Sequence, residues 1–301
     1  MPKYSRPRIR LRWLIPVLIA GIAIALGNVS STAQTTEDWR SEWELEEGFD
    51  IEIDSVGFDK PTSIAFVPNP GTNPKDPLYF VTELRMRVSV VTNDRTVITF
   101  AKDFFPDATL REHNWVQDRE PATAGICLDP TTGYVFVTFA YADSAGIPRN
   151  NMVRFTTTPK TFSTTPGDKY FFTEIFSGHR SSHSHQIGPC KINNGVLTVS
   201  VGDANQVSLS QQINNTAGKV LRMTVDGLPS AGNPYKSYPA SDPASYVWAS
   251  GFRNPFGLAV LNEQVFIADN GHFIDRFLRV EPGGEYLWDG TDTSIGAIAD
   301  L

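Results

Sequence analysis

Short apolar stretches recur in pairs along the chain, separated by turns rich in glycine, asparagine and proline. The second member of each pair is rich in β-branched and aromatic residues, which favour strands. The pairs are residues 63–68 with 78–82, 125–130 with 135–139, 188–192 with 197–201, and 257–261 with 265–268. Their starts are 62, 63 and 69 positions apart, so the sequence predicts a repeated strand pair.

Further strand candidates between these pairs bring each period to about four strands. They are residues 87–91 with 97–101, 152–156 with 170–176, and 219–225 with 246–250. No long helical periodicity follows residue 50. Four-stranded units at a fixed period are typical of the blades of a β-propeller. A β-sandwich, the competing interpretation, would show no such period. The sequence therefore predicts an all-β fold, a β-propeller of four-stranded blades.

A propeller binds ligands at its axis, where the ends of the inner strands and the loops between blades converge. If the first strand of each pair is the inner strand, the polar residues just beyond the inner strands are the candidate site. They are Glu120, His185, Asp203, Arg253, Asn254, Asp269 and Asn270.

The N-terminus has a pattern of its own. Five basic residues and no acidic residue occupy the first 12 positions, and an apolar run of 15 residues follows at 13–27. With the small residues at 31–33, this is the pattern of a signal peptide. A spanning helix needs about 20 apolar residues, so an uncleaved membrane anchor through 13–27 is the alternative for residues 1–33. Residues 34–49 are expected to be a linker and 50–301 an exported propeller, periplasmic or extracellular.

The composition, 41% hydrophobic and 20% charged, is that of an ordinary globular protein. Without residues 1–33 the chain carries 21 basic and 33 acidic residues, a net charge of −12. This argues against nucleic acid as a partner and against electrostatic binding to anionic lipid. A bound anion therefore needs a local cluster of arginine or lysine.

The chain has two cysteines, Cys127 and Cys190, both in apolar, strand-like surroundings. An exported protein can pair them, and the sequence leaves a disulfide and two buried thiols equally open. There is no Cys-x-x-Cys motif, so neither a thiolate zinc site nor a haem attachment is indicated.

Residues 251–257, Gly-Phe-Arg-Asn-Pro-Phe-Gly, are a candidate anion-binding segment. Arg253 offers a rigid fork of donors for a carboxylate or phosphate, and Asn254 adds a donor and an acceptor. Pro255 fixes its own φ and keeps the preceding asparagine extended. An ordinary loop with a surface arginine is the alternative.

Three of the five histidines, His179, His183 and His185, fall within seven residues directly before an inner strand. Imidazole titrates near neutrality, so one of them is a candidate general base. The three together are a candidate zinc site, and plain surface histidines are the third possibility. Asp203 and the glycine-rich turns at 269–272 and 283–288 are candidates for calcium binding or for turn capping.

In order along the chain, these segments resemble the soluble quinoprotein family of glucose and aldose sugar dehydrogenases, also called glucose/sorbosone dehydrogenases. No single motif is decisive, but the ordered series over residues 50–290 is specific. The matching segments are residues 60–66, 81–83, 124–130, 185–188, 201–203, 218–222, 225–227, 251–257, 268–271 and 283–286.

The resemblance implies a six-bladed propeller that binds pyrroloquinoline quinone (PQQ) and calcium at its axis and oxidises an aldose to its lactone. His185 matches the family's catalytic base, and Arg253 and Asn254 match the residues that contact the quinone. Glu120 loosely matches a further cofactor-binding acid. Backbone oxygens near Gly271 and His272 match the calcium loop. A sugar substrate and an external electron acceptor are the implied partners.

Several positions depart from the family pattern. The glycine-proline of the calcium loop is Gly271-His272 here, the acids that follow it are replaced around Arg276, and Ser184 stands where glucose-specific members carry an acid. About four blades fit before Leu301, so a truncated propeller is expected. The alternatives are a non-catalytic extracellular binding propeller or an inactive fragment, and, more weakly, a metal hydrolase using the three histidines.

Overall fold

The computed structural model describes residues 43–105, 123–176, 181–292 and 297–300. The chain divides into two units, residues 1–52 and 53–301. Of the first unit, only residues 43–52 are described, and they contain a turn in which the Phe49 N–H donates to the Glu46 carbonyl at 3.1 Å. The expected signal peptide or anchor, residues 1–33, lies outside the described residues. Within the described ranges, no helix is long and apolar enough to cross a membrane.

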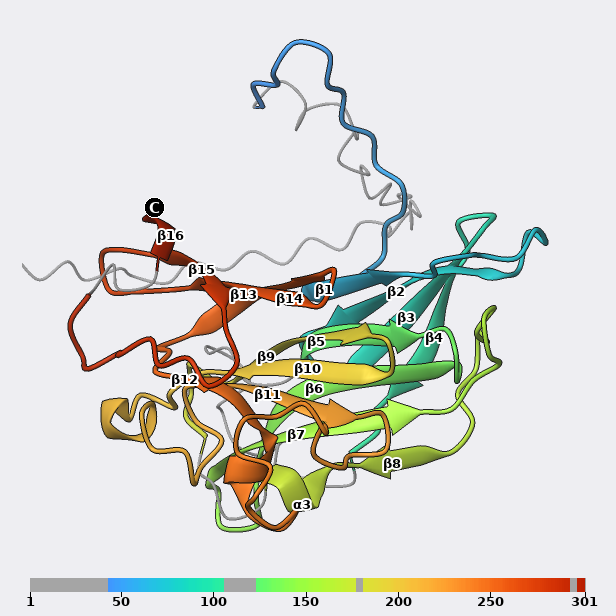
Figure 1. Ribbon diagram of the computed structural model, residues 1–301. Coiled ribbons are helices and arrows are strands. Elements are labelled where there is room, and N and C mark those ends of the chain that lie inside the picture. Colours follow the sequence, from blue (N-terminus) through green and yellow to red (C-terminus); the bar gives the residue numbers. More distant parts are fainter. Residues whose placement is uncertain (1–42, 106–122, 177–180, 293–296, 301) are drawn as a thin grey trace, which may run out of the picture. The chain divides into compact units, whose positions relative to one another are not determined.

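The second unit consists of four four-stranded antiparallel sheets, which confirms the all-β, propeller-like fold (Figure 1). We call them blades 1 to 4. Blade 1 holds β1 (Pro61–Phe66), β2 (Pro77–Glu83), β3 (Arg87–Thr92) and β4 (Val97–Lys102). Blade 2 holds β5 (Thr123–Asp129), β6 (Tyr134–Ala142), β7 (Pro148–Phe155) and β8 (Lys169–Phe171). Blade 3 holds β9 (Ile187–Asn193), β10 (Val196–Val201), β11 (Lys219–Thr224) and β12 (Val247–Ser250). Blade 4 holds β13 (Pro255–Leu261), β14 (Gln264–Asp269), β15 (Arg276–Val280) and β16 (Ala297–Asp300).

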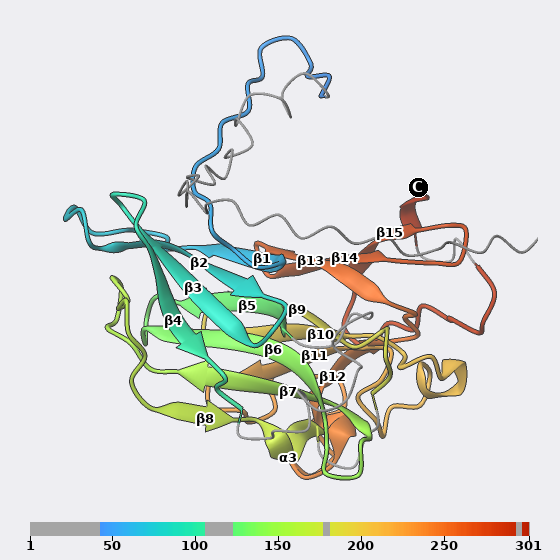
Figure 2. The same cartoon turned by 180° about the vertical axis from the view of Figure 1, so that it is seen from behind.

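The first strand of every blade is its inner strand. In each sheet the strands follow chain order from one edge to the other. The first strands also pack on one another in sequence, β1 on β5, β5 on β9 and β9 on β13. The view from behind shows blades 1 and 2 as neighbouring sheets (Figure 2). The prediction that the first strand of each pair lies innermost is therefore correct.

Apolar side chains fill the space between neighbouring blades. Blades 1 and 2 share a cluster in which Phe80, Phe100, Phe104 and Phe155 are buried and several rings meet edge to face, with centroids 5.1–5.6 Å apart. Central strands such as β6 are covered on both faces, which is why they are nearly continuous apolar runs. Edge-to-face pairs are a favoured geometry for packed rings.

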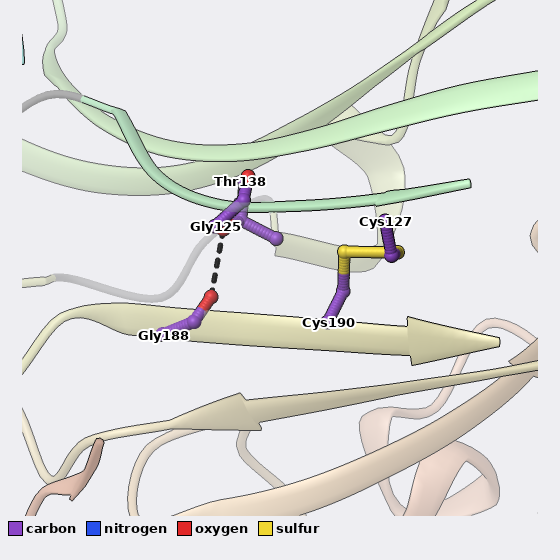
Figure 3. The surroundings of a disulfide bond; sticks show 5 residues. All are labelled: Gly125, Cys127, Thr138, Gly188 and Cys190. Carbon is purple, nitrogen blue, oxygen red and sulfur yellow. Dashed lines mark hydrogen bonds between the residues drawn. A yellow bond between two sulfur atoms is a disulfide. The ribbon is translucent and has the colours of Figure 1, made fainter. Parts of the chain in front are cut away.

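A disulfide joins the inner strands of blades 2 and 3 (Figure 3). It links Cys127 on β5 to Cys190 on β9, with Cα atoms 5.7 Å apart. Beside it, the Thr138 hydroxyl donates to the Gly188 carbonyl at 2.7 Å. A Cβ at Gly125 would lie 2.7 Å from the backbone of Pro189, so the close approach of the two strands requires glycine there. The question that the sequence left open is thus settled in favour of the disulfide.

Two segments differ from the strand assignment expected from the sequence. The strand expected at 170–176 ends at Phe171 and is followed by a short helix, α3 (Thr173–Phe176), which turns Ile175 and Phe176 into the core. The outer strands of blade 4, β15 and β16, were not expected. In β15 the buried positions are Arg276, Leu278 and Val280, so a charged residue interrupts the apolar alternation that identifies a half-buried strand.

Candidate active site

Four polar loops meet at one edge of blades 3 and 4. His185 directly precedes β9 and Asp203 follows β10, and the paired residues Ile187 and Val201 place these two ends side by side. Blade 4 repeats this arrangement, because Pro255 pairs with Asp269. In an antiparallel pair, the start of the first strand and the end of the second lie at the same edge. The topology therefore brings together residues that are distant in sequence.

His185 and Asp203 form a hydrogen-bonded pair. The imidazole Nδ1 lies 2.7 Å from the Asp203 carboxylate, which is 1% exposed. Because an ionised carboxylate only accepts hydrogen bonds, Nδ1 carries a proton, and in the neutral ring Nε2 then keeps the lone pair. This is the tautomer that a general base requires.

The carboxylate of Asp203 has two further donors. The Trp288 indole N–H donates to Oδ2 at 2.8 Å, and the Asn205 backbone N–H donates to Oδ1 at 2.8 Å. The backbone N–H of Asp203 itself donates to the Arg253 carbonyl at 2.7 Å, which links blade 3 to the loop that opens blade 4. The aspartate is therefore part of a network rather than a free candidate calcium ligand.

The local backbone explains how His185 reaches this position. Its φ is +54°, in the left-handed region that non-glycine residues seldom adopt. A Cβ on Gly202 would lie 2.5 Å from the carbonyl carbon of His185, so only glycine at the end of β10 allows this approach. Backbone strain of this kind is common at functional sites.

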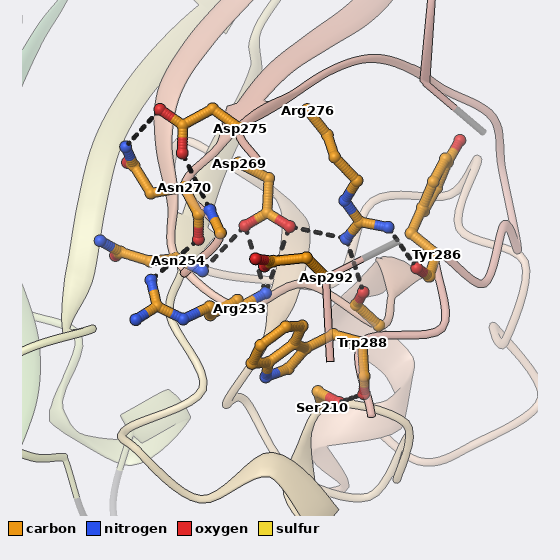
Figure 4. Close-up of polar contacts among 12 residues, drawn as sticks. Ser210, Arg253, Asn254, Asp269, Asn270, Asp275, Arg276, Tyr286, Trp288 and Asp292 are labelled. Carbon is orange, nitrogen blue, oxygen red and sulfur yellow. Dashed lines mark hydrogen bonds and ion pairs between the residues drawn. The ribbon is translucent and has the colours of Figure 1, made fainter. Parts of the chain in front are cut away.

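The Asp269 carboxylate points toward the Arg-Asn segment (Figure 4). Its carboxylate accepts the backbone N–H groups of Arg253, at 3.2 Å, and of Asn254, at 2.8 Å. Arg276 forms an ion pair with it at 2.7 Å and also donates to the Tyr286 carbonyl at 2.6 Å. Burial raises the pKa of Asp269, and the pairing with Arg276 and the two amides oppose that shift.

The side chains of Arg253 and Asn254 keep unused hydrogen-bonding capacity. Arg253 donates from Nη1 to the Asn270 carbonyl at 2.9 Å, while its buried Nε has no partner among the described residues. The Asn254 side-chain amide likewise has no partner within the described part of the chain (Figure 4). A buried guanidinium nitrogen without an acceptor is a costly arrangement. These donors fit an anionic ligand such as the carboxylates of PQQ.

The loop at Gly271 and His272 is held by two acids. Asp275 accepts the Gly271 N–H at 3.0 Å, and Asp292 accepts the N–H groups of His272 and Phe273, both at 2.7 Å. Burial raises the pKa of Asp292, but the hydrogen bonds from these amides lower it by more, so the net shift is downward. Both carboxylates thus accept hydrogen bonds from the backbone amides of the loop.

The described residues contain no group of three or more His, Cys, Asp or Glu side chains that could hold a metal ion. A calcium ion at this loop would therefore depend on the backbone oxygens of Gly271 and His272. Of the three histidines of the candidate zinc site, His179 lies outside the described residues. Glu120, the loosely matched cofactor-binding acid, also lies outside them.

The structure brings together His185, Arg253, Asn254 and Asp269, all of which the sequence singled out. It adds roles that the sequence did not reveal, those of Asp203 as the partner of His185, of Arg276 as the counter-charge of Asp269, and of Trp288. The Gly-Asp after β10 was a visible signal for the first. The other two had none: Trp288 lies 85 residues from Asp203, and Arg276, although only seven residues from Asp269, interrupts the apolar alternation of its strand.

The four sheets described above define the class of an all-β, propeller-like protein. The chain belongs to the glucose/sorbosone dehydrogenase family, which matches residues 58–296. This family is one of sugar dehydrogenases, which are oxidoreductases. No match was found among curated protein sequences.

Solved structures with the same fold include the PQQ-bound aldose sugar dehydrogenase of Streptomyces coelicolor, with 23% identity over 83% of this chain and 70% of that one, and a TM-score of 0.64. A putative oxidoreductase (glucose dehydrogenase) of Thermus thermophilus shares 22% identity over 81% of this chain and 71% of that one, with a TM-score of 0.61. For the apo soluble aldose sugar dehydrogenase of Escherichia coli, the identity is 16%, the coverage 77% and 63%, and the TM-score 0.54.

Proposed function

We propose that the protein oxidises an aldose to its lactone with PQQ as cofactor. The observation that carries this proposal is the juxtaposition of a His–Asp pair with an arginine whose buried Nε meets no acceptor among the residues that the structure describes. Family membership supports a sugar as the substrate class, and one of the similar solved structures is that of a PQQ-bound enzyme.

His185 is the proposed catalytic base. With Nδ1–H donated to Asp203, Nε2 is free to take the proton of the sugar C1 hydroxyl. As that proton leaves, the C1–H bond breaks with its electron pair and C1 becomes the carbonyl carbon of the lactone. Asp203 stabilises the imidazolium that forms, as the carboxylate of a catalytic triad does. Bound PQQ would supply the acceptor for that hydride.

Arg253 and Asn254 are the proposed cofactor-binding residues. The guanidinium provides charge and a fixed fork for a carboxylate, and the amide of Asn254 adds a donor and an acceptor beside it. Asp269 holds both backbone N–H groups, so the two side chains leave the segment in a defined direction. Calcium bound by the backbone oxygens of Gly271 and His272 is a further part of the proposal, but no step of the mechanism depends on it.

We also propose that the protein is exported, cleaved or anchored at its N-terminus. The Cys127–Cys190 disulfide supports an oxidising compartment. Detection of the protein in the periplasm or medium, rather than in the reducing cytosol, is the direct check.

The test is dye reduction by the full chain with added PQQ, calcium and a panel of aldoses, combined with a spectroscopic titration of PQQ. We expect PQQ-dependent turnover that His185→Gln lowers at least about 100-fold while PQQ binding stays within a few-fold. His183→Gln, two residues away, is the matched control and should retain turnover. Turnover that survives in His185→Gln excludes the base assignment. Failure of the wild-type protein to bind PQQ would favour the non-catalytic binding propeller.

A further inference from the structure

Trp288 lies where the base, the arginine and the Gly271 loop meet, although it is not a candidate ligand itself. Its side chain is 3% exposed. The indole N–H points to Asp203, the ring lies 5.7 Å from the guanidinium carbon of Arg253, and its centroid is 5.7 Å from that of His272. One buried ring therefore lies beside Asp203, Arg253 and His272, and Figure 4 shows it next to Arg253.

The indole N–H donates to one oxygen of Asp203 while the other oxygen faces His185. Oδ1 accepts from His185 and from the Asn205 backbone, whereas Trp288 is the only donor to Oδ2 among the described residues. A carboxylate can turn about its Cβ–Cγ bond, and that torsion has a broad minimum. With a donor fixed on Oδ2, rotation would cost a buried hydrogen bond. Trp288 and the Asn205 backbone N–H thus hold the two oxygens of the carboxylate that faces the imidazole.

The backbone around Trp288 fixes the direction of the ring. The backbone N–H of Trp288 donates to the Gly251 carbonyl at 3.0 Å. The backbone carbonyl of Trp288 accepts from the Ser210 hydroxyl at 2.9 Å and from the Gln211 side-chain amide at 3.1 Å. These partners come from the loops after β10 and β12. The ring is therefore held by blade 3, although its own segment follows β15 of blade 4.

Besides its hydrogen bond to Asp203, the ring of Trp288 contacts Arg253. A guanidinium within about 6 Å of an indole centroid is attracted to the ring face, and the measured distance is 5.7 Å. Because the Arg253 backbone also lies against Asp203, through its carbonyl, the ring and the main chain connect the same two residues. Movement of the tryptophan would affect the base and the arginine together.

We propose that Trp288 is the positioning residue of the site, whose N–H sets the Asp203 carboxylate that orients His185 and whose ring supports Arg253. The consequence for catalysis rests on the proposed function, but the orientation of His185 does not. Both can be measured separately.

The first test uses the protein without added cofactor. In ¹⁵N-labelled wild type, the His185 side-chain signals should report the Nδ1–H tautomer, with Nε2 unprotonated. Trp288→Phe should give a mixture of tautomers. Trp248→Phe is the matched control, because Trp248 is also buried at 9% exposure but its Nε1 has no partner among the described residues, and it should leave the His185 signals unchanged.

A second variant separates the hydrogen bond from packing. Replacement of Trp288 by β-(3-benzothienyl)alanine keeps the shape of the ring but substitutes sulfur for the N–H, so it should shift the tautomer even if Trp288→Phe folds poorly. A wild-type tautomer in the benzothienyl variant would overturn the proposal and leave Trp288 a packing residue.

Turnover provides the second readout. With PQQ and sugar, the benzothienyl variant should lose about tenfold in kcat with KM changed less than about twofold, as for partners that orient a catalytic group. An unchanged kcat would overturn the catalytic part of the proposal. If wild-type protein shows no PQQ-dependent turnover but the tautomer still shifts, the proposed function fails while the positioning role of Trp288 holds.

Discussion

Three charged side chains at the inner edge of blades 3 and 4 are almost completely buried, and each has a different kind of partner. Asp203 accepts from two side chains, Asp269 pairs with Arg276, and Lys219 donates to backbone carbonyls. A buried charge that loses its partner destabilises a protein by several kcal/mol. These residues therefore couple the shape of the site to the stability of the fold.

Lys219 leads to a prediction about pH. Its side chain is fully buried, and Nζ donates to the carbonyls of Leu209 and Ser210 at 2.8 Å and of Ala217 at 2.6 Å. Burial lowers the pKa of Lys219 to about 7, whereas an unfolded lysine titrates near 10.4. Between these values the unfolded state binds one more proton. The penalty for burying the ammonium is complete below pH 7 and is relieved as the pH rises toward 10.4.

We therefore expect the free energy of unfolding to include a term from Lys219 that rises by about 2 kcal/mol from pH 7 to pH 9. Urea denaturation of the wild type and of Lys219→Met at both pH values isolates this term, because the variant lacks the titrating group. An equal pH dependence in the two proteins would mean that the three carbonyls keep the ammonium charged throughout this range.

At the scale of strands, much of the architecture follows from the sequence. The inner pairs β1–β2, β5–β6, β9–β10 and β13–β14 were expected close to their observed bounds, because alternation and turn chemistry are local signals. The same topology predicted that the residues flanking these strands would meet. The sequence pattern did not predict β15, because the buried Arg276 is stabilised there by its ion pair with Asp269 and not by an apolar environment. Nor did it predict the contact of Trp288 with Asp203, 85 residues away.

The strand β15 anchors the Arg-Asn segment through this ion pair. Arg276→Met should leave the Asp269 carboxylate buried with backbone donors but without a counter-charge, and should lower the free energy of unfolding by about 3–5 kcal/mol. Chemical denaturation measures this loss. The double variant Asp269→Asn/Arg276→Met should recover part of it, because the uncompensated charge is gone. A single variant as stable as wild type would show that the pair contributes nothing to the fold.

At the scale of the whole molecule, the blades are held together by side chains between the sheets and by one covalent link. Blades 1 and 2, 2 and 3, and 3 and 4 each share an apolar cluster. Only the boundary between blades 2 and 3 has a disulfide within the described residues. That boundary lies directly beside blade 3, which provides His185 and Asp203. The stability of the site region and the redox state of the two cysteines should therefore be linked.

The disulfide closes a loop between residues separated by 63 positions. A cross-link of this length restricts the unfolded chain and stabilises the folded state by about 4 kcal/mol in the chain-entropy model. Reduction of the protein, or the double substitution Cys127→Ser/Cys190→Ser, should lower the free energy of unfolding by about that amount. Urea denaturation with and without reductant measures the difference, and the double variant is its control, because reductant should not affect it. Equal unfolding midpoints for oxidised and reduced wild type would show that packing between blades 2 and 3 suffices without the covalent link.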